Sequence, residues 1–409
     1  MSTRPFFGWR VVAAAFTAQL LSTGCTFAVF GVFVVPLSQA FGVSEGKFGL
    51  GLSITFLVMG AMGPLVGRWI DSGFARPLLL AGASITGCGM LVLSRAAEFW
   101  QLGLVFCVVV GVGAACFGPT PSTGLVANWF VRRRGLALGL TVAGATVASW
   151  LAPPLAAYLI DSFGWRGALA SLGTGALAIG IPMLWFCVVG RPEDVGQLPD
   201  GDPPDESGAA ASPSVPVDTG TLLRDARLWL LALGFALVFS SPIVIILVLV
   251  PYGEQLGFSR QNATYFFSTM APFSLLGKVV FGVVADRVRA VLAVWIVVLG
   301  GALVWALLYT DPSYPLFLGI GALYGAAIGA AGPLHGVMIG RCFGREAFGR
   351  ASGIGGLAGL PVIAAAPAIA GILRDATGSY HAVFALQIVL VLLGGALLSL
   401  IRVPRSSAS

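Results

Sequence analysis

Long apolar stretches, separated by short polar breaks, run through almost the whole of this 409-residue chain. About 20 predominantly apolar residues are enough, at 1.5 Å per residue of helix, to cross a bilayer core of roughly 30 Å. Stretches of this length recur, and the charged breaks between them predict twelve membrane-spanning helices. We place these spans at residues 11–37, 48–69, 77–95, 100–128, 135–160, 167–190, 227–252, 263–285, 290–310, 314–340, 350–373 and 381–402.

The composition supports an integral membrane protein that lies in a lipid bilayer. Hydrophobic residues make up 57% of the chain, charged residues only 10%, and the mean hydropathy is +0.93. A water-soluble domain of this length does not reach such values. The first span is too long for a secretory signal and lacks its small-residue cleavage pattern, so we interpret it as a retained helix.

The charges indicate how the chain crosses the membrane. With the N-terminus placed inside, seventeen of the 23 Lys and Arg residues fall on the cytoplasmic side and five on the opposite side. This asymmetry is typical of membrane proteins that keep their basic loops in the cytoplasm. We therefore expect both termini in the cytoplasm and a multi-pass protein of the inner (plasma) membrane. The net charge of +6 is then an orientation signal, and we expect no nucleic-acid partner.

One polar segment divides the chain into two halves. Residues 191–222 contain seven acidic residues, several prolines and almost no large apolar side chain, so they cannot offset the entropy of becoming ordered. We interpret them as a flexible cytoplasmic linker. The expected domains are an N-terminal six-helix bundle over 1–190 and a C-terminal six-helix bundle over 223–409.

The two halves repeat the same landmarks. Gly67 and Asp71 in GRWID end the second span, as Gly282 and Asp286 in GVVAD end the eighth. Phe130 has a counterpart in Phe343, and the motif DSFG at 161–164 has one in DATG at 375–378. The offset along the chain is nearly the same for all three pairs. Such agreement predicts two parallel six-helix repeats, an arrangement in which transporters bind their substrate at the interface of the repeats.

Lys278 is the one charge deep inside a predicted span. It lies eight residues before Asp286, about 12 Å along the helix. A charge at that depth costs about 2.5 to more than 10 kcal/mol, so it usually faces a protein interior or an aqueous cavity and marks a path for a substrate or ion. The alternative is a lysine that extends its ammonium group to the nearer interface, which is a long reach from this position. We predict that Lys278 binds substrate.

Two further residues are candidates for the same site. Ser274 lies one turn before Lys278 on the same face, although its hydroxyl could instead bond to its own backbone. Phe117 lies near the middle of the fourth span, among glycines and prolines that allow a helix to kink and open a cavity. Core packing is the alternative for Phe117.

Three more polar or aromatic residues lie at a similar depth. Thr26 in the first span and Tyr324 in the tenth are candidates for lining a cavity. His335, beside Pro333, could relay a proton, since histidine titrates near neutral pH, or it could be a hydrogen-bonded packing residue.

The sequence offers no constellation for catalysis. There are two histidines, no HExxH, no paired cysteines and no G-x-S-x-G motif, so we expect neither an enzyme nor a metal or other cofactor. All seventeen acidic residues fall outside the spans or at their ends. That distribution argues against an antiporter that exchanges cationic drugs for protons through a buried carboxylate.

The loops after the second and eighth spans, GRWIDSGFAR and GVVADRVRA, place an acid at a helix end and arginines just beyond it. These loops resemble the loop that marks the major facilitator superfamily in each half of the molecule. The resemblance implies an all-α fold of twelve transmembrane helices. It also implies that Asp71, Arg76, Asp286 and Arg287 pair and separate with helix ends during gating.

Three segments resemble the monocarboxylate transporter family more closely. They are NWFVRRRGLALGLTVAGATVASWLAPP at 128–154, the FGW of residues 7–9 and the GWR of residues 164–166, although the acid that usually precedes FGW is absent. The family places a substrate-binding arginine where this chain has Lys278, and an aspartate where it has Ser274. Lysine, unlike arginine, is able to lose its proton inside a protein.

The resemblance implies a secondary active transporter of a small monocarboxylate such as lactate or pyruvate. We expect proton-coupled symport by alternating access, with the anion and a proton as partners and a monomeric protein. The alternatives are an organic anion exchanger of the oxalate/formate type, whose members have a similar pattern, and, from another class, a transport-inactive membrane sensor.

Overall fold

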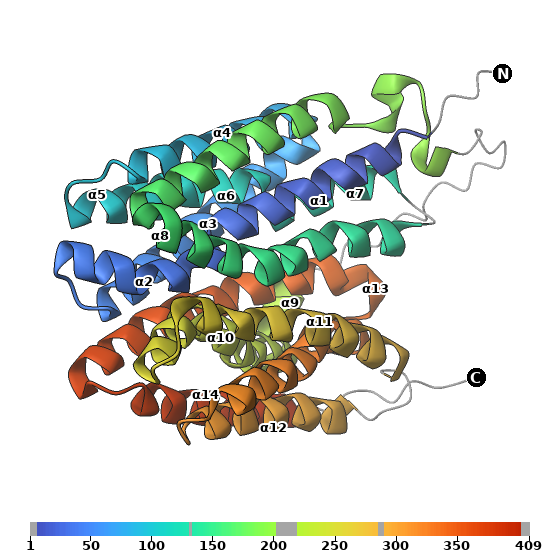
Figure 1. Ribbon diagram of the computed structural model, residues 1–409. Coiled ribbons are helices and arrows are strands. Elements are labelled where there is room, and N and C mark those ends of the chain that lie inside the picture. Colours follow the sequence, from blue (N-terminus) through green and yellow to red (C-terminus); the bar gives the residue numbers. More distant parts are fainter. Residues whose placement is uncertain (1–5, 131–132, 202–218, 285–289, 402–409) are drawn as a thin grey trace. The chain divides into compact units, whose positions relative to one another are not determined.

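The computed structural model describes residues 6–130, 133–201, 219–284 and 290–401, and within these ranges it contains helices and connecting segments without a β-strand (Figure 1). The chain forms two compact units. One comprises Met1–Val43 with Ile54–Gly208, and the other comprises Ser44–Ser53 with Ala209–Ser409. The long helix α3, Gly46–Asp71, therefore contributes residues to both. The predicted all-α membrane fold is confirmed.

The rest of the first unit consists of helices that pack through small and aliphatic side chains. In chain order these are α1 (Gly8–Cys25), α2 (Phe27–Phe41), α4 (Ala75–Leu93), α5 (Phe99–Leu104), a π-helical stretch (Val105–Val110), α6 (Gly111–Phe117), α7 (Pro119–Trp129) and α8 (Arg134–Cys187).

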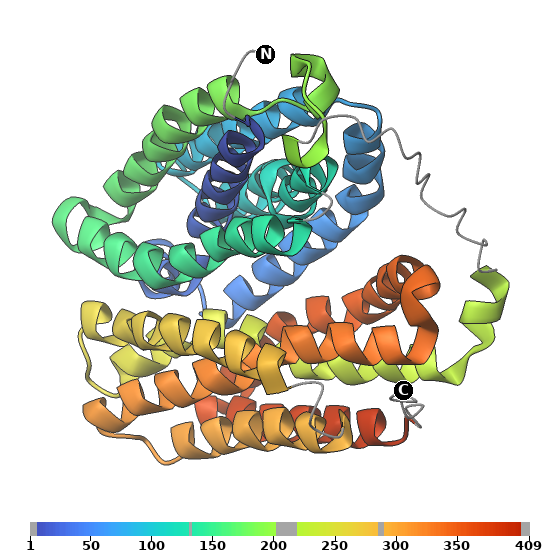
Figure 2. The ribbon, with the colours of Figure 1, turned by 90° about the vertical axis from the view of Figure 1, so that its right-hand side faces the viewer.

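Local backbone breaks divide two of the predicted spans and separate two others. Thr26 has non-helical dihedral angles (φ −117°, ψ −85°) and separates α1 from α2. Gly118 is extended (φ −78°, ψ −151°) and Pro119, which lacks an N–H, starts α7, so the predicted kink in the fourth span is confirmed. Gly164 has φ +69°, a conformation that favours glycine, and here α8 turns back on itself (Figures 1 and 2).

The second unit contains the helices that follow the predicted linker. These are α9 (Thr219–Arg224), α10 (Ala226–Gln255), α11 (Arg260–Val284), α12 (Ala290–Leu308), α13 (Tyr314–Thr377) and α14 (Tyr380–Ser399). Gly378, with φ +67°, ends α13 in the left-handed conformation that glycine adopts without strain.

These helices account for the twelve predicted crossings. Ten segments of the described chain are long and apolar enough to cross a membrane. One of them, Leu136–Cys187, has 52 residues and holds the fifth and sixth predicted spans on the two sides of the turn at Gly164. The helix α11 is not among the ten, but its 25 residues extend over about 37 Å, so we assign it as the eighth crossing.

Each unit has its own apolar core. In the first unit, Leu79, Phe117, Trp129 and Phe130 are among the fully buried residues of one cluster. In the second, α10, α12, α13 and α14 contribute to a cluster of aliphatic residues that includes Val294 and Met338. Inside a bilayer the hydrophobic effect does not drive helices together, because lipid tails are as apolar as the side chains. The close fit of these buried side chains therefore holds the helices of each unit against one another.

The predicted linker falls partly inside the described residues. Pro192–Val195 and Pro199–Gly201 form short 3₁₀ turns, and Thr219–Arg224 forms α9. Gln197 Oε1 accepts a hydrogen bond from the N–H of Phe7 at 2.9 Å, and Asp200 Oδ1 accepts one from the N–H of Arg133 at 3.3 Å. The remainder, residues 202–218, lies outside the described residues. The predicted boundaries of a flexible linker at 191–222 stay a prediction.

Candidate functional site

The helix that carries Lys278 is held against α13 at close range. A side chain at Gly325 or Gly329 of α13 would collide with the backbone of α11 at Met270 and Ser274. In the same way, a side chain at Gly277 of α11 would meet the backbone of Ala326. Three glycines thus let the two backbones touch, and this contact sets the position of α11 along α13.

Lys278 follows directly after Gly277, and Ser274 lies one turn earlier. Both side chains are half-buried. Lys278 makes no hydrogen bond or ion pair with any residue that the structure describes. The site therefore presents an amine without a partner among the described residues and a hydroxyl one helical turn away.

The other side of α11 is apolar. Phe273, Leu276 and Val280 are exposed side chains on it. A position two residues from Lys278 lies about 200° around the helix, so Leu276 and Val280 are on the side opposite the lysine. Lys278 itself lies about 40° around the helix from Ser274, whose backbone faces Gly329 of α13.

Tyr324 belongs to a buried group of hydrogen-bonded side chains in the second unit. Its hydroxyl lies 2.9 Å from Ser241 Oγ, and the same oxygen accepts a hydrogen bond from Trp305 Nε1 at 2.9 Å. These three residues come from α13, α10 and α12. Only 1% of Tyr324 is exposed. The hydroxyl thus has a protein partner, and a role in lining a substrate cavity stays a prediction.

His335 of α13 lies between aromatic rings of α10. Its ring centroid is 4.7 Å from that of Phe235 and 5.8 Å from that of Phe239, both in edge-to-face arrangements. The side chain is half-buried and makes no hydrogen bond with a described residue. Aromatic packing fixes the orientation of this imidazole. The predicted proton relay is not tested by these contacts.

Phe117 and Thr26 both lie in the core of the first unit. Phe117 is fully buried at the end of α6 and packs in the main apolar cluster. Thr26 is also fully buried, and its hydroxyl donates a hydrogen bond to the carbonyl oxygen of Ser22 at 2.6 Å. Their predicted contact with substrate stays a prediction.

The loop residues differ in how far the structure describes them. Arg76 donates a hydrogen bond from Nη2 to the carbonyl oxygen of Trp185 at 2.6 Å, and its guanidinium lies 4.8 Å from the centre of the Trp185 ring. A cation there is favourable, because the last turn of α8 ends with unpaired carbonyl groups. The side chain of Asp71 and all of Asp286 and Arg287 lie outside the described residues, so pairing between the loops stays a prediction.

Our sequence prediction missed two buried amides. Gln19 in α1 and Gln387 in α14 are each only 1% exposed, and the Nε2 atom of each has no hydrogen-bond partner among the described residues. A search of the spans for charged residues alone passes over them. A search for any strongly polar side chain within an apolar stretch would have found both.

The described residues contain no group of three or more His, Cys, Asp or Glu side chains that could hold a metal ion. What the site on α11 offers instead is electrostatic recognition. A half-buried ammonium group beside a hydroxyl matches a small carboxylate, which accepts charge-assisted hydrogen bonds from both.

Comparisons with known proteins identify chains that are similar to this one. The model of the Major Facilitator Superfamily matches residues 15–303 and 243–409. Monocarboxylate transporter 11 of Homo sapiens is 30% identical, over 95% of this chain and 81% of the relative. Monocarboxylate transporter 13 of Bos taurus is 28% identical, over 96% and 88%, and monocarboxylate transporter 12 of Rattus norvegicus is 27% identical, over 93% and 82%.

A solved structure shares the fold. The crystal structure of a bacterial homolog to the human lysosomal transporter Spinster has a TM-score of 0.77 and covers 98% of this chain and 97% of its own. It is 15% identical in sequence.

Proposed function

The chain belongs to the Major Facilitator Superfamily, as a membrane transporter similar to the monocarboxylate transporters, and on this premise we propose that it moves a small lactate- or pyruvate-like monocarboxylate together with a proton. It is a transporter and not an enzyme. In the proposed mechanism, Lys278 binds the carboxylate, with Ser274 as the adjacent donor, and the two six-helix halves alternate access to the site. The protein acts as a monomer in the plasma membrane, with both termini in the cytoplasm.

The observation that carries the proposal is the amine of Lys278 on α11, which has no partner among the described residues. An ionisable side chain inside a membrane protein usually pairs with another group or serves a transport path. Lys278 has no partner among the described residues. An anionic substrate supplies the missing partner, and a single cation suits a monoanion better than a dianion.

The same lysine explains how a proton could accompany the anion. A carboxylate beside Lys278 stabilises the protonated amine, and by thermodynamic linkage the protonated amine stabilises the carboxylate to the same extent. In this proposal the empty site holds the neutral amine, so the loaded site gains one negative charge and one proton, and the transport step is electroneutral. Because every acid of the sequence lies outside or at the ends of the predicted spans, no buried carboxylate competes for this role.

Counterflow of labelled lactate in proteoliposomes tests the assignment. Lys278→Gln removes the charge and is expected to abolish saturable uptake. Losing one member of a close charge pair costs about 2–5 kcal/mol, a factor of roughly thirty to several thousand in affinity. Lys47→Gln is the matched control, since Lys47 is the only other lysine and is exposed at the start of α3. Near-normal uptake by Lys278→Gln would refute the site.

Lys278→Arg separates binding from coupling. Arginine keeps the positive charge but does not release its proton. We expect this variant to exchange lactate for lactate while it loses accumulation driven by a pH gradient. Equal accumulation by wild type and Lys278→Arg would show that the proton follows another route, and His335 would be the next residue to test.

Two other functions give different results in the same vesicles. An exchanger of the oxalate/formate type would show counterflow with either anion but no net uptake driven by a pH gradient. A transport-inactive sensor would bind lactate without any counterflow. Proton uptake on lactate binding, measured by calorimetry in buffers of different ionisation enthalpy, is expected for the symporter alone.

A further inference from the structure

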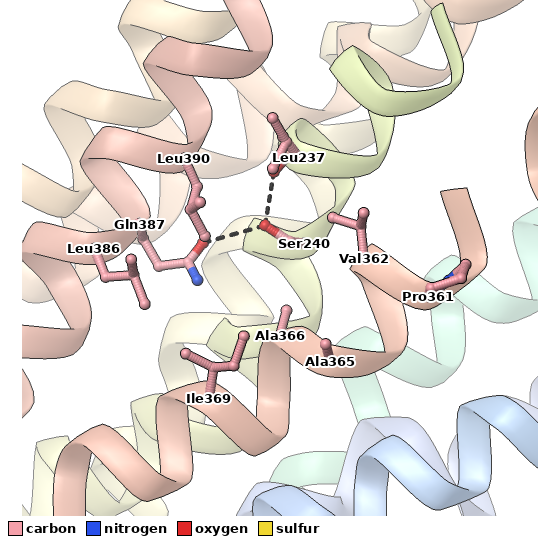
Figure 3. Close-up of a pocket in the computed structure, with 10 residues that line it drawn as sticks. All are labelled: Leu237, Ser240, Pro361, Val362, Ala365, Ala366, Ile369, Leu386, Gln387 and Leu390. Carbon is pink, nitrogen blue, oxygen red and sulfur yellow. Dashed lines mark hydrogen bonds between the residues drawn. The ribbon is translucent and has the colours of Figure 1, made fainter. Parts of the chain in front are cut away.

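The second unit contains a pocket that lies away from Lys278, between α10, the second half of α13 and α14 (Figure 3). Its volume is about 340 Å³, at the lower end of the roughly 300–1,000 Å³ range of small-molecule sites. None of its described lining residues comes from α11. It is therefore a separate feature from the proposed monocarboxylate site.

The wall of this pocket is almost wholly apolar. Among the described residues that line it, only Ser240 and Gln387 are polar, and none is charged. On α13, Pro361, Ala365 and Ile369 line the pocket at intervals of four residues and are exposed, so one stripe of this helix forms its open edge. An uncharged, apolar molecule fits these walls.

Gln387 gives the pocket one unsatisfied hydrogen-bond donor. The residue is 1% exposed, and its Nε2 atom has no partner among the described residues. The other end of the amide, Oε1, lies 3.5 Å from Ser240 Oγ. The Ser240 hydroxyl has one proton to donate, and the carbonyl oxygen of Leu237 is the nearer acceptor, at 2.6 Å. Figure 3 shows the nitrogen of Gln387 directed toward the space that the lining residues surround.

An unpaired buried amide is costly, because it has lost its hydrogen bonds to water without replacement. A ligand that brings a hydrogen-bond acceptor to Nε2 recovers that cost. A hydrocarbon of the same shape does not. On this ground an apolar ketone is expected to bind more tightly than its hydrocarbon counterpart.

The depth of Gln387 limits the source of such a ligand. Seven residues separate it from Tyr380 at the start of α14, about 10 Å along the helix. The ester groups of phospholipids lie at the edge of the hydrocarbon core, whereas this amide lies well inside a helix of 20 residues. A free small molecule dissolved in the hydrocarbon phase reaches the amide, and a phospholipid head does not.

We propose that the pocket between α10, α13 and α14 binds small uncharged apolar molecules that carry one carbonyl acceptor, with Gln387 Nε2 as the donor to that carbonyl. Benzophenone is a suitable probe, because it combines one carbonyl with an apolar body and, on illumination, attaches to nearby C–H bonds. Diphenylmethane is its matched control, since it has almost the same shape and no acceptor.

The experiment labels the full-length protein in lipid nanodiscs and locates the attachment sites by peptide mass spectrometry. We expect saturable labelling of peptides that contain residues 361–369 and 386–390. Diphenylmethane is expected to compete roughly two- to tenfold less well than benzophenone itself, the factor expected for one hydrogen bond. Equal competition by the two compounds in the wild-type protein overturns the proposal without the need for any variant.

Two variants and one control variant sharpen the result. Gln387→Leu removes the donor, so benzophenone and diphenylmethane should then compete equally. Ala365→Phe fills the open edge and should abolish saturable labelling, whereas Ala385→Phe, at an exposed position of α14 outside the pocket lining, should leave it unchanged. Labelling that is non-saturable, or that persists unchanged in Ala365→Phe, refutes the site.

Discussion

The helices α3 and α11 occupy corresponding places in the two repeats, but only α11 carries a charge in mid-span. The offset along the chain that takes Gly67 to Gly282 also takes Gly63 to Lys278. A side chain added at Gly63 would meet nothing within 4 Å, whereas one at Gly277 of α11 would collide with α13. Next to the position that carries the lysine, α11 is therefore tightly seated, whereas the corresponding part of α3 is open; α3 makes its own close backbone contacts with α13 only nearer its start, at Gly46 and Gly49. A lysine that must meet a small anion needs a fixed position, and the glycines provide it.

The largest expected effect comes from removing the cation that distinguishes the two helices. A lysine at the centre of a transmembrane helix costs about 2.5–3.5 kcal/mol on insertion scales. Since Lys278 has no partner among the described residues, Lys278→Met should raise the apparent melting temperature in detergent while uptake is lost. The reciprocal change, Gly63→Lys, should lower it although space is open there. A lower melting temperature for Lys278→Met would mean that the lysine is structural.

The next effect tests the seating of α11. Gly277→Ala places a methyl group against the backbone of Ala326 and should destabilise the protein by about 1–3 kcal/mol, with loss of uptake because Lys278 is displaced. A control change in the other repeat, Gly63→Ala at an open position of α3, should instead stabilise its helix by about 0.5–1 kcal/mol. Thermal unfolding and lactate counterflow measure the two. Equal effects of both changes would remove the distinction between α3 and α11.

Much of this comparison was open to prediction from the sequence. Span length, the position of charges and the nearly constant offset between matching motifs identify twelve helices in two repeats, because the bilayer imposes its thickness on any helix that crosses it. Lys278 stands out for the same reason. The kink before Pro119 follows from a missing N–H.

Other features depend on contacts that no linear pattern reveals. No sequence pattern distinguishes Gly325 and Gly329 from other glycines of membrane helices. Their role follows only from their close contact with the backbone of α11. The break at Thr26, inside a stretch that we predicted as one helix, has no proline beside it, and Gly24 two residues earlier is no more than an ordinary glycine of a membrane helix. For Tyr324, the partner Ser241 lies 83 residues away in the chain, so its buried hydrogen bond was hidden.

That hydrogen bond gives a third, smaller prediction about the bundle that holds the cation. Tyr324→Phe removes one partner of Ser241 while Trp305 still donates to the same oxygen. We expect a loss of about 0.5–1.5 kcal/mol in stability. A double-mutant cycle with Trp305→Phe should show coupling, since both residues bond to one oxygen. Strictly additive effects would mean that the three side chains do not act as one group.

The smallest expected effect concerns how the first helix of each bundle begins. Asp225 caps α10 by accepting the N–H of Arg227 at 2.8 Å, whereas Phe7 at the start of α1 provides no side-chain cap. Hydrogen bonds from the Arg227 side chain lower the pKa of Asp225 below 3.8. A carboxyl whose pKa is lower in the folded state stabilises the protein above its unfolded pKa and loses that contribution as the pH falls through the folded value.

Asp225→Asn tests this cap, because asparagine keeps the acceptor oxygen but not the charge. The Arg227 side chain is 40% exposed, so solvent screening limits the ion pair to about 1 kcal/mol or less. We therefore expect Asp225→Asn to melt slightly below wild type at pH 7 and the gap to close as the pH falls below about 4. Comparing the two proteins at each pH cancels the titration of all other groups. A gap that stays constant down to pH 3 would show that the charge of Asp225 contributes nothing. The start of α10 would then differ from the start of α1 only by the uncharged hydrogen bond of its cap.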